Sequence, residues 1–114
     1  MRGDIVSAEL PYPADHPSRE QSGRRPAIAV LADTSPALNP MIMVVPLTSN
    51  PTASRFPYTL EIHPSGANGL SMVSILLVFQ LRALDRNRIG TVIGRLEEHY
   101  LMMLNEIMRD MLGL

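Results

Sequence analysis

Short apolar runs separated by polar turns occupy most of the chain, and several of those turns contain proline. Continuous apolar runs of this length are typical of buried strands, whereas alternation of apolar and polar residues marks a half-exposed strand. The pattern predicts strands at residues 4–10, 27–31, 41–45, 56–62, 74–81 and 88–96. For the last of these a short helical turn is the alternative. The run at 74–81 is the most apolar and predicts a central strand, and Pro57 suits an edge strand.

From Leu96 onward the apolar period changes from that of a strand to that of a helix. One helical face carries Leu96, Tyr100, Met103, Leu104, Ile107, Met108, Met111 and Leu112. Gly113 follows at the position of a C-capping glycine. Strands followed by one terminal helix, without helices between them, favour a mainly β fold. We expect an antiparallel, strongly bent sheet or small barrel with the helix on one side.

The composition is that of a folded protein, because 46% of the 114 residues are hydrophobic. This length predicts one domain, residues 1–114. No apolar run approaches the ~20 residues that span a bilayer, and no signal-peptide pattern is visible, so we expect a cytoplasmic protein. The chain has no cysteine, which excludes disulfides, thiol nucleophiles and thiolate metal sites.

The basic residues are unusual because all ten are arginine, although the net charge is only −1. Arginine suits two-point contact with phosphate, while a genome rich in G and C is the neutral explanation. Arg19, Arg24 and Arg25 lie close together in sequence, and Arg82 and Arg86 form part of a later group. A nearly neutral protein can therefore still carry a basic cleft.

Two polar turns adjoin the apolar runs at 27–31 and 41–45. The first is Glu20-Gln21-Ser22-Gly23-Arg24-Arg25-Pro26, and the second is Pro46-Leu47-Thr48-Ser49-Asn50. Polar loops held by buried strands often carry functional groups. We expect these two turns to form one site for a phosphodiester, with Arg25 in the loop before its strand.

Five segments, in order along the chain, resemble the MazF/PemK family of bacterial toxin endoribonucleases. They are Arg2-Gly3-Asp4-Ile5-Val6, the Glu20 to Pro26 turn, Val45-Pro46-Leu47-Thr48-Ser49, Gly69-Leu70 with Ser74, and Gln80-Leu81-Arg82-Ala83-Leu84-Asp85-Arg86-Asn87-Arg88-Ile89. The resemblance implies a small SH3-like barrel of the CcdB/PemK/MazF type. It also implies a homodimeric type II toxin that cuts single-stranded RNA without metal or cofactor, inhibits translation and is neutralised by an antitoxin.

By family position, the catalytic residues fall on Arg25, Thr48 and Glu20. Metal-free cleavage uses the 2′-OH as nucleophile and leaves a 2′,3′-cyclic phosphate and a 5′-OH. Arg25 can stabilise the phosphorane, and Thr48 can donate a further hydrogen bond. Because arginine is not deprotonated in proteins, Glu20 is the better general base. The expected RNA-binding residues are Arg19, Ser22, Arg24, Ser49, Asn50, Gln80, Arg82 and Arg86; no metal ligands are expected.

The chain departs from the family pattern at several positions. Phe79 stands where the family often has an acidic residue, and Ser7 and Ala8 stand where an aromatic residue is usual. Two other functions therefore remain: a non-enzymatic, CcdB-like toxin that binds DNA gyrase, and a homologue that only binds an antitoxin. His16, His63 and His99 are expected to be exposed rather than catalytic.

Overall fold

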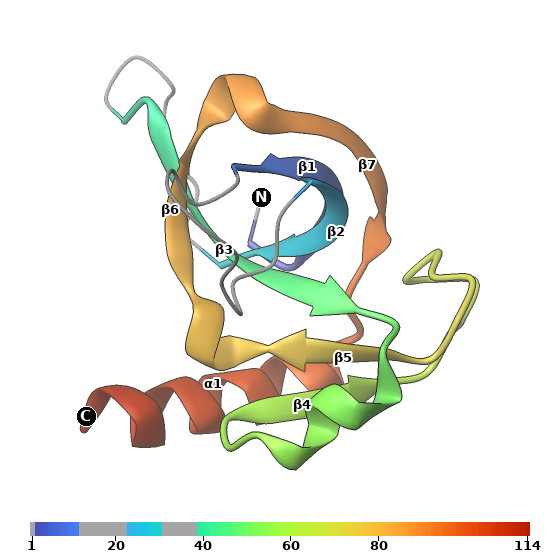
Figure 1. The fold of residues 1–114 in the computed structure, drawn as a ribbon, viewed down its shortest axis with the longest axis vertical. Coiled ribbons are helices and arrows are strands. Elements are labelled where there is room, and N and C mark those ends of the chain that lie inside the picture. The colour runs from blue at the N-terminus through green and yellow to red at the C-terminus, as the bar shows by residue number, and fades with distance from the viewer. Residues whose placement is uncertain (1, 12–22, 31–38) are drawn as a thin grey trace.

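The computed structural model describes residues 2–11, 23–30 and 39–114, and these residues form a curled antiparallel sheet with one helix beneath it (Figure 1). The described strands are β1 (Asp4–Leu10), β2 (Gly23–Ala29), β3 (Met41–Thr48), β4 (Thr59–Ile62), β5 (Ser74–Leu77), β6 (Arg82–Asp85) and β7 (Ile89–Arg95). Three short 3₁₀ turns lie at η1 (Pro51–Arg55), η2 (Val78–Gln80) and η3 (Arg86–Arg88), and helix α1 is Glu98–Leu112.

Strand β3 is the strand around which the sheet bends. The described strands follow the order β4-β5-β3-β2-β1-β7, and β6 also pairs with β3. The first half of β3 pairs with β6, and its last two residues pair with β5. Because β3 changes partners along its length, the sheet curls instead of staying flat, and α1 lies along β4 and β5 (Figure 1). The predicted fold class, a bent antiparallel sheet with a terminal helix on one side, is confirmed.

The core has two main parts, because alternate residues of each strand point to opposite faces of the sheet. One part lies between the sheet and the helix and includes Ile5, Ile28 and Leu104. The other lies on the opposite face and includes Val6, Ala8 and Val44. Burial of both faces explains why the strands read as nearly continuous apolar runs. Within the described residues, no helix is long and apolar enough to cross a membrane.

Strands β2 and β3 reach beyond the predicted boundaries. Strand β2 begins at Gly23, four residues before the predicted start, so the expectation that Arg25 lies in a loop was wrong. Its register with β1 continues through Arg25, which stands opposite Ala8. Strand β3 runs to Thr48 because Leu47 and Thr48 pair with residues of β5. Pairing across the sheet, not local propensity, sets these ends.

The predicted strands 56–62 and 74–81 were too long. Only Thr59–Ile62 is a strand in the first, because Pro57 has no N–H to donate and Tyr58 has a left-handed φ of 58°. In the second, β5 ends at Leu77, and the chain turns through η2 before β6, a separate strand that the apolar pattern did not reveal.

The C-terminal part follows the prediction more closely. Residues 89–95 are a strand rather than a helical turn. Helix α1 begins at Glu98, so buried Leu96 lies before the helix and not on its face. Gly113 caps the helix in the left-handed conformation, with a φ of 73°, and its N–H bonds to carbonyls of the last turn.

Candidate functional site

The start of β2, the end of β3 and the chain before β5 enclose a cavity of about 190 Å³, here called the Arg25 cavity. It is lined by Arg25, Pro26, Leu47, Thr48, Ser49, Leu70, Ser71, Met72 and Ser74. The structure therefore brings together Arg25, Thr48 and Ser49, which come from the two polar turns singled out in the sequence. Their meeting follows from the pairing of β2 with β3, whose register places Ala27 opposite Pro46.

Thr48 is fixed at the end of β3 by its pairing with Ile75 of β5. Its Oγ1 accepts a hydrogen bond of 3.2 Å from the backbone N–H of Asn50. A threonine hydroxyl can accept and donate at the same time. Thr48 can therefore keep this bond and direct its O–H toward a ligand in the cavity.

Residues 63–73, here called the 63–73 loop, supply the third wall of the Arg25 cavity. Asn68 is fully buried and organises this loop. Its Oδ1 accepts from the N–H groups of Ser65 and Leu70, both at 3.0 Å. Its Nδ2 donates to the carbonyl of His63 at 2.8 Å and to Oε1 of Glu97 at 3.1 Å. These bonds hold the loop in one conformation.

The 63–73 loop also packs closely on β7. The backbone N–H of Arg95 donates to the carbonyl of Ala67 at 2.9 Å. A Cβ on Gly94 would lie 2.4 Å from the carbonyl oxygen of Asn68, and a Cβ on Gly69 would lie 2.5 Å from that of Ile93. Both contacts are with backbone atoms, so only glycine fits at these positions. Strand β7 thereby positions the residues that line the cavity.

Sequence reasoning did not assign a role to the lining residues of this loop. Leu70 belongs to a segment that resembles the family, but Ser71 and Met72 carried no signal at all. The Asn68-Gly69 pair marks a turn in the sequence. The pair does not indicate that the turn packs against β7. This packing is what brings the loop to Arg25.

A second cavity, of about 230 Å³ and here called the Phe79 cavity, adjoins the first at Thr48. It is lined by Thr48, Asn50, Thr52, Ala53, Arg55, Phe56, Leu77, Phe79 and Gln80. Asn50 and Gln80, both expected to bind RNA, lie here. Thr52, Arg55 and Phe56 were not expected at the site, and Phe56 had been assigned to the predicted strand at 56–62 instead of to the end of the η1 turn.

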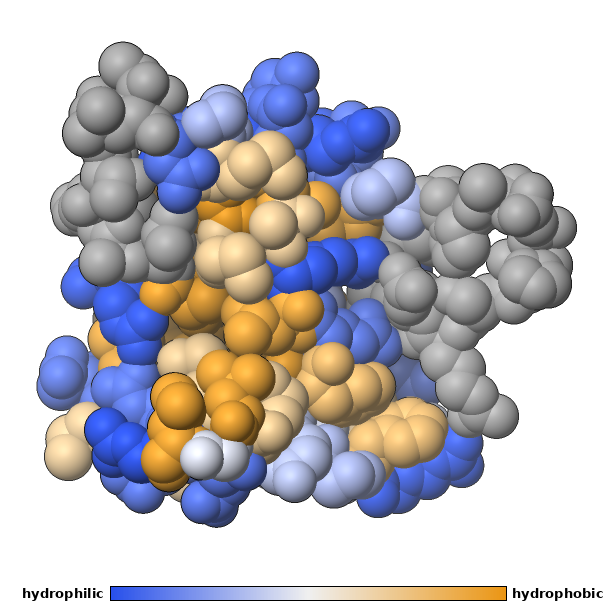
Figure 2. Space-filling model, turned by 90° about the vertical axis from the view of Figure 1, so that its left-hand side faces the viewer, coloured by the Kyte–Doolittle hydropathy of each residue, from blue (hydrophilic) through white to orange (hydrophobic). Residues whose placement is uncertain are grey.

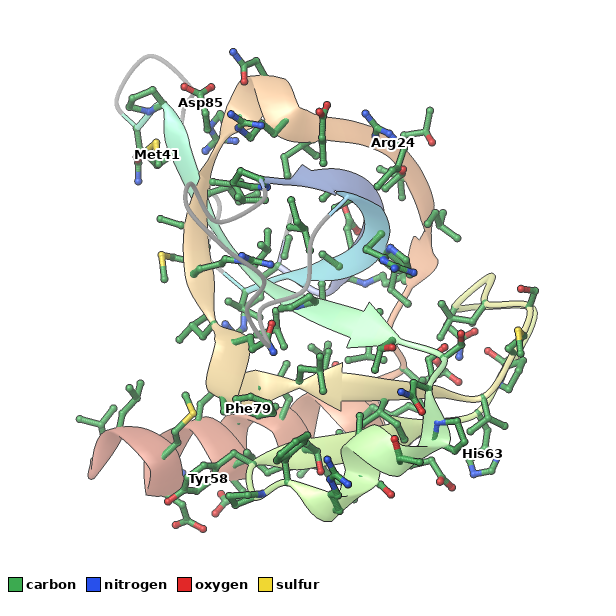
Figure 3. All side chains as sticks on the ribbon, viewed as in Figure 1. Arg24, Met41, Tyr58, His63, Phe79 and Asp85 are labelled. Atoms are coloured by element: carbon green, nitrogen blue, oxygen red, sulfur yellow. The ribbon has the colours of Figure 1, made fainter. Side chains whose placement is uncertain are left out.

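The remaining predicted site residues lie elsewhere or outside the described part of the chain. Arg24 is next to Arg25 in β2 and so projects to the other face, where its guanidinium lies 3.6 Å from Glu9 and 3.2 Å from the hydroxyl of Ser7 (Figure 3). Arg86 donates to the carbonyl of Asn39 at 2.7 Å. Arg82 begins β6, opposite Val44, and neither Arg24, Arg82 nor Arg86 lines either cavity. Arg19, Glu20 and Ser22 lie outside the described residues.

The Arg25 cavity suits an anion, because its described lining offers one guanidinium and several hydroxyls and contains no carboxylate. Among the described residues, His, Asp and Glu side chains form no group that could hold a metal ion. The site thus offers the groups that contact phosphate oxygens.

The whole chain is similar to proteins of one family. Residues 1–112 match the sequence profile of the PemK-like, MazF-like toxins of type II toxin-antitoxin systems. The chain is 29% identical over 113 residues to Endoribonuclease MazF of Staphylococcus saprophyticus. The alignment covers 99% of this chain and 91% of that protein.

Solved structures share the fold. MazF of Deinococcus radiodurans superposes with a TM-score of 0.77 at 22% identity, covering 99% of this chain and 96% of that one. A mycobacterial endoribonuclease in complex with its cognate antitoxin gives 0.69 at 18% identity, covering 100% and 93%. With a family profile that spans residues 1–112 and a shared fold, this chain belongs to the PemK-like, MazF-like toxins of type II toxin-antitoxin systems.

Proposed function

We propose that the protein is a toxin endoribonuclease that cleaves single-stranded RNA, including mRNA, without a metal ion and so inhibits translation. The observation that carries the proposal is the Arg25 cavity, which Arg25 and Thr48, both chosen from the sequence as catalytic, line together. A toxin that acts only by binding another protein would need neither group there. The name of its staphylococcal relative, an endoribonuclease, supports the same activity.

The reaction needs a general base, a general acid and groups that stabilise the charge on the phosphorane. The 2′-oxygen attacks the adjacent phosphorus and loses its proton to a base, and the 5′-oxygen leaves with a proton from an acid. The products are a 2′,3′-cyclic phosphate and a 5′-OH. Arg25 stabilises the charge on the phosphorane with its planar pair of N–H donors, and Thr48 adds a neutral hydrogen bond.

Glu20 is the proposed base. The described lining of the Arg25 cavity contains no His, Asp or Glu, so the proton acceptor must come from another part of the chain or from water. Glu20 precedes Gly23, the first residue of β2, by three positions, and Arg25 follows in the same strand. A carboxylate this near to Arg25 in the sequence is a candidate both for accepting the proton and for orienting the guanidinium.

A cleavage assay with end-group analysis tests this function. Wild-type protein incubated with a long unstructured RNA should cut it at a short preferred sequence and leave cyclic phosphate and 5′-OH ends. An excess of chelator should leave the rate unchanged, because the proposed groups hold no metal. If the RNA stays intact and the protein poisons DNA gyrase instead, the protein is a CcdB-like toxin. If the protein neither cuts RNA nor poisons gyrase, the remaining hypothesis is a homologue that only binds an antitoxin.

The cognate antitoxin is the second proposed partner. The complex of the mycobacterial relative contains a toxin and its antitoxin. An acidic, disordered antitoxin segment laid over the Arg25 cavity would pair with the guanidinium and exclude RNA. Toxin, antitoxin and mRNA would then meet in the cytoplasm.

We also propose a homodimer, formed through β6 and the C-terminal half of α1. Figure 2 shows apolar side chains gathered on the side of the molecule where Figure 1 places these two elements. Met43 and Ala83 are direct partners across β3 and β6, and the partly buried Ile107, Met108 and Met111 lie on α1. Among the described residues, β6 pairs only with β3, so no described strand occupies its other edge. The residues of β5 are buried within one chain and so do not contribute to this interface.

Sedimentation tests the dimer. Wild-type protein at micromolar concentration should sediment at about twice the 12.6 kDa of one chain. Ala83→Arg should give the monomer mass, because it places a charge in the proposed contact while Ala83 itself is exposed in one chain. Val92→Arg, an equally drastic change at an exposed position of β7, should leave the dimer intact. A wild-type monomer would refute the interface.

A further inference from the structure

The Phe79 cavity contains an aromatic surface that the cleavage chemistry does not use. Phe79 is 38% exposed, and the centroid of its ring lies 5.5 Å from that of Phe56, with the two ring planes tilted by 54°. The guanidinium carbon of Arg55 lies 5.0 Å from the centroid of the Phe56 ring. Two rings and an arginine in contact with each other therefore line this cavity.

The backbone holds this surface in place. Asn50 caps η1 by accepting from the N–H of Thr52 at 3.1 Å, and the N–H of Phe56 closes the turn on the carbonyl of Ala53 at 3.2 Å. On the other side, the N–H of Leu81 bonds to the carbonyl of Val78 at 3.0 Å and fixes η2, which carries Phe79. A surface fixed in this way needs little ordering when a ligand binds.

The dimensions and position of the cavity restrict its occupant. Its volume of about 230 Å³ is below the ~300–1,000 Å³ usual for small-molecule sites, which suits one ring of a longer ligand. It shares Thr48 with the Arg25 cavity, so a ligand held by its phosphate at Arg25 continues directly into it. Unpaired RNA bases stack on aromatic rings and on arginine planes.

We propose that Phe79 and Phe56, together with Arg55, form a stacking site for one unpaired base of the RNA, the base beside the phosphodiester held at Arg25 and Thr48. This inference rests on the proposed endoribonuclease function. It gives position 79 a role in substrate recognition and none in proton transfer.

Two carboxamides can read the edge of the stacked base. Asn50 and Gln80 both line the Phe79 cavity. The Oδ1 of Asn50 accepts from the N–H and the hydroxyl of Thr52, at 3.1 and 2.9 Å, so its NH₂ group is the part that can donate to a base. Stacking supplies affinity for any base, and these amides supply a preference among bases.

The first test combines a protein variant with an altered RNA. Once the preferred cut is mapped, a short RNA that contains it is made with an abasic nucleotide at each position flanking the cut in turn. At one position the loss of the base should raise the wild-type KM between about fivefold and a hundredfold, with little change in kcat. Phe79→Leu should raise the KM for intact RNA by a similar factor and should show no further penalty from that abasic position. Phe79→Tyr should retain the wild-type KM.

The second test does not depend on cleavage. A 2-aminopurine base is placed at the same position of an RNA that lacks the attacking 2′-OH. Binding to wild-type protein should quench its fluorescence, and binding to Phe79→Leu should not. Tyr58→Leu is the matched control, because Tyr58 is 42% exposed and lies outside the Phe79 cavity. It should change neither the KM nor the quenching.

The outcomes separate the two proposals. Suppose that wild-type protein cuts RNA, but that Phe79→Leu and the abasic position raise the KM independently of each other, so that the combined increase is the product of the two. The stacking site is then refuted and the endoribonuclease function stands. Unquenched 2-aminopurine in the wild-type complex would refute the stacking site in the same way. If wild-type protein cuts no RNA, the endoribonuclease function fails, and the stacking site fails with it.

Discussion

Arg25→Ala should lower the single-turnover rate of RNA cleavage by about a hundredfold to a thousandfold, the usual cost of losing one donor to a developing oxyanion. The side chain is exposed and lines the Arg25 cavity, so its removal takes nothing from either part of the core. Its backbone stays paired in β2, opposite Ala8. The variant should therefore melt and sediment as the wild type does.

Graded substitutions identify what Arg25 contributes. Arg25→Lys keeps the charge but loses the planar pair of donors, so it should remain strongly impaired. Thr48→Ala removes one neutral hydrogen bond and should cost only about two- to tenfold. Arg88→Ala, which removes an arginine of η3 that lines neither cavity, should cleave at the wild-type rate. A folded, dimeric Arg25→Ala protein with wild-type activity would show that the Arg25 cavity is not the active site.

The fold class was predictable because most of the strands and the helix carry their own periodic signal, although β6 does not. Strand β1 and helix α1 have the expected apolar patterns, and Gly113 ends the helix as predicted. Strand ends were not predictable in the same way. Whether Arg25 belongs to a loop or to a strand depends on its pairing with Ala8, which lies on a different strand.

Some residues of the candidate site were likewise predictable from the sequence, and others depend on contacts between distant segments. Arg25 and Thr48 could be chosen from two polar turns and a family resemblance, and the structure brings them to one cavity. The aromatic cavity could not be foreseen, because it needs Phe56 and Phe79 from separate turns to approach within 5.5 Å. In the sequence, Phe79 was only a departure from the family pattern.

Gly94→Ala should lower the free energy of unfolding by about 3 kcal/mol, the upper end of what overpacking usually costs. The added Cβ would lie 2.4 Å from the carbonyl oxygen of Asn68 and 2.7 Å from that of Ala67, and neither backbone atom can rotate away as a side chain could. The 63–73 loop must then leave β7, which strains the buried hydrogen bonds of Asn68. For a domain of this size the melting temperature should fall by about 10 °C.

Gly66→Ala is the matched control, because it adds the same methyl group to the same loop where no atom lies within 4 Å. Its melting temperature should stay close to that of the wild type, with all proteins compared at one concentration because a dimer melts in a concentration-dependent way. At a temperature where Gly94→Ala is still folded, its cleavage rate should also fall, because the displaced loop carries Leu70, Ser71 and Met72 out of the Arg25 cavity. Equal melting of the Gly94→Ala and Gly66→Ala proteins would contradict the close contact between loop and strand. A destabilised Gly94→Ala protein that cuts RNA normally would show that the loop does not shape the active site.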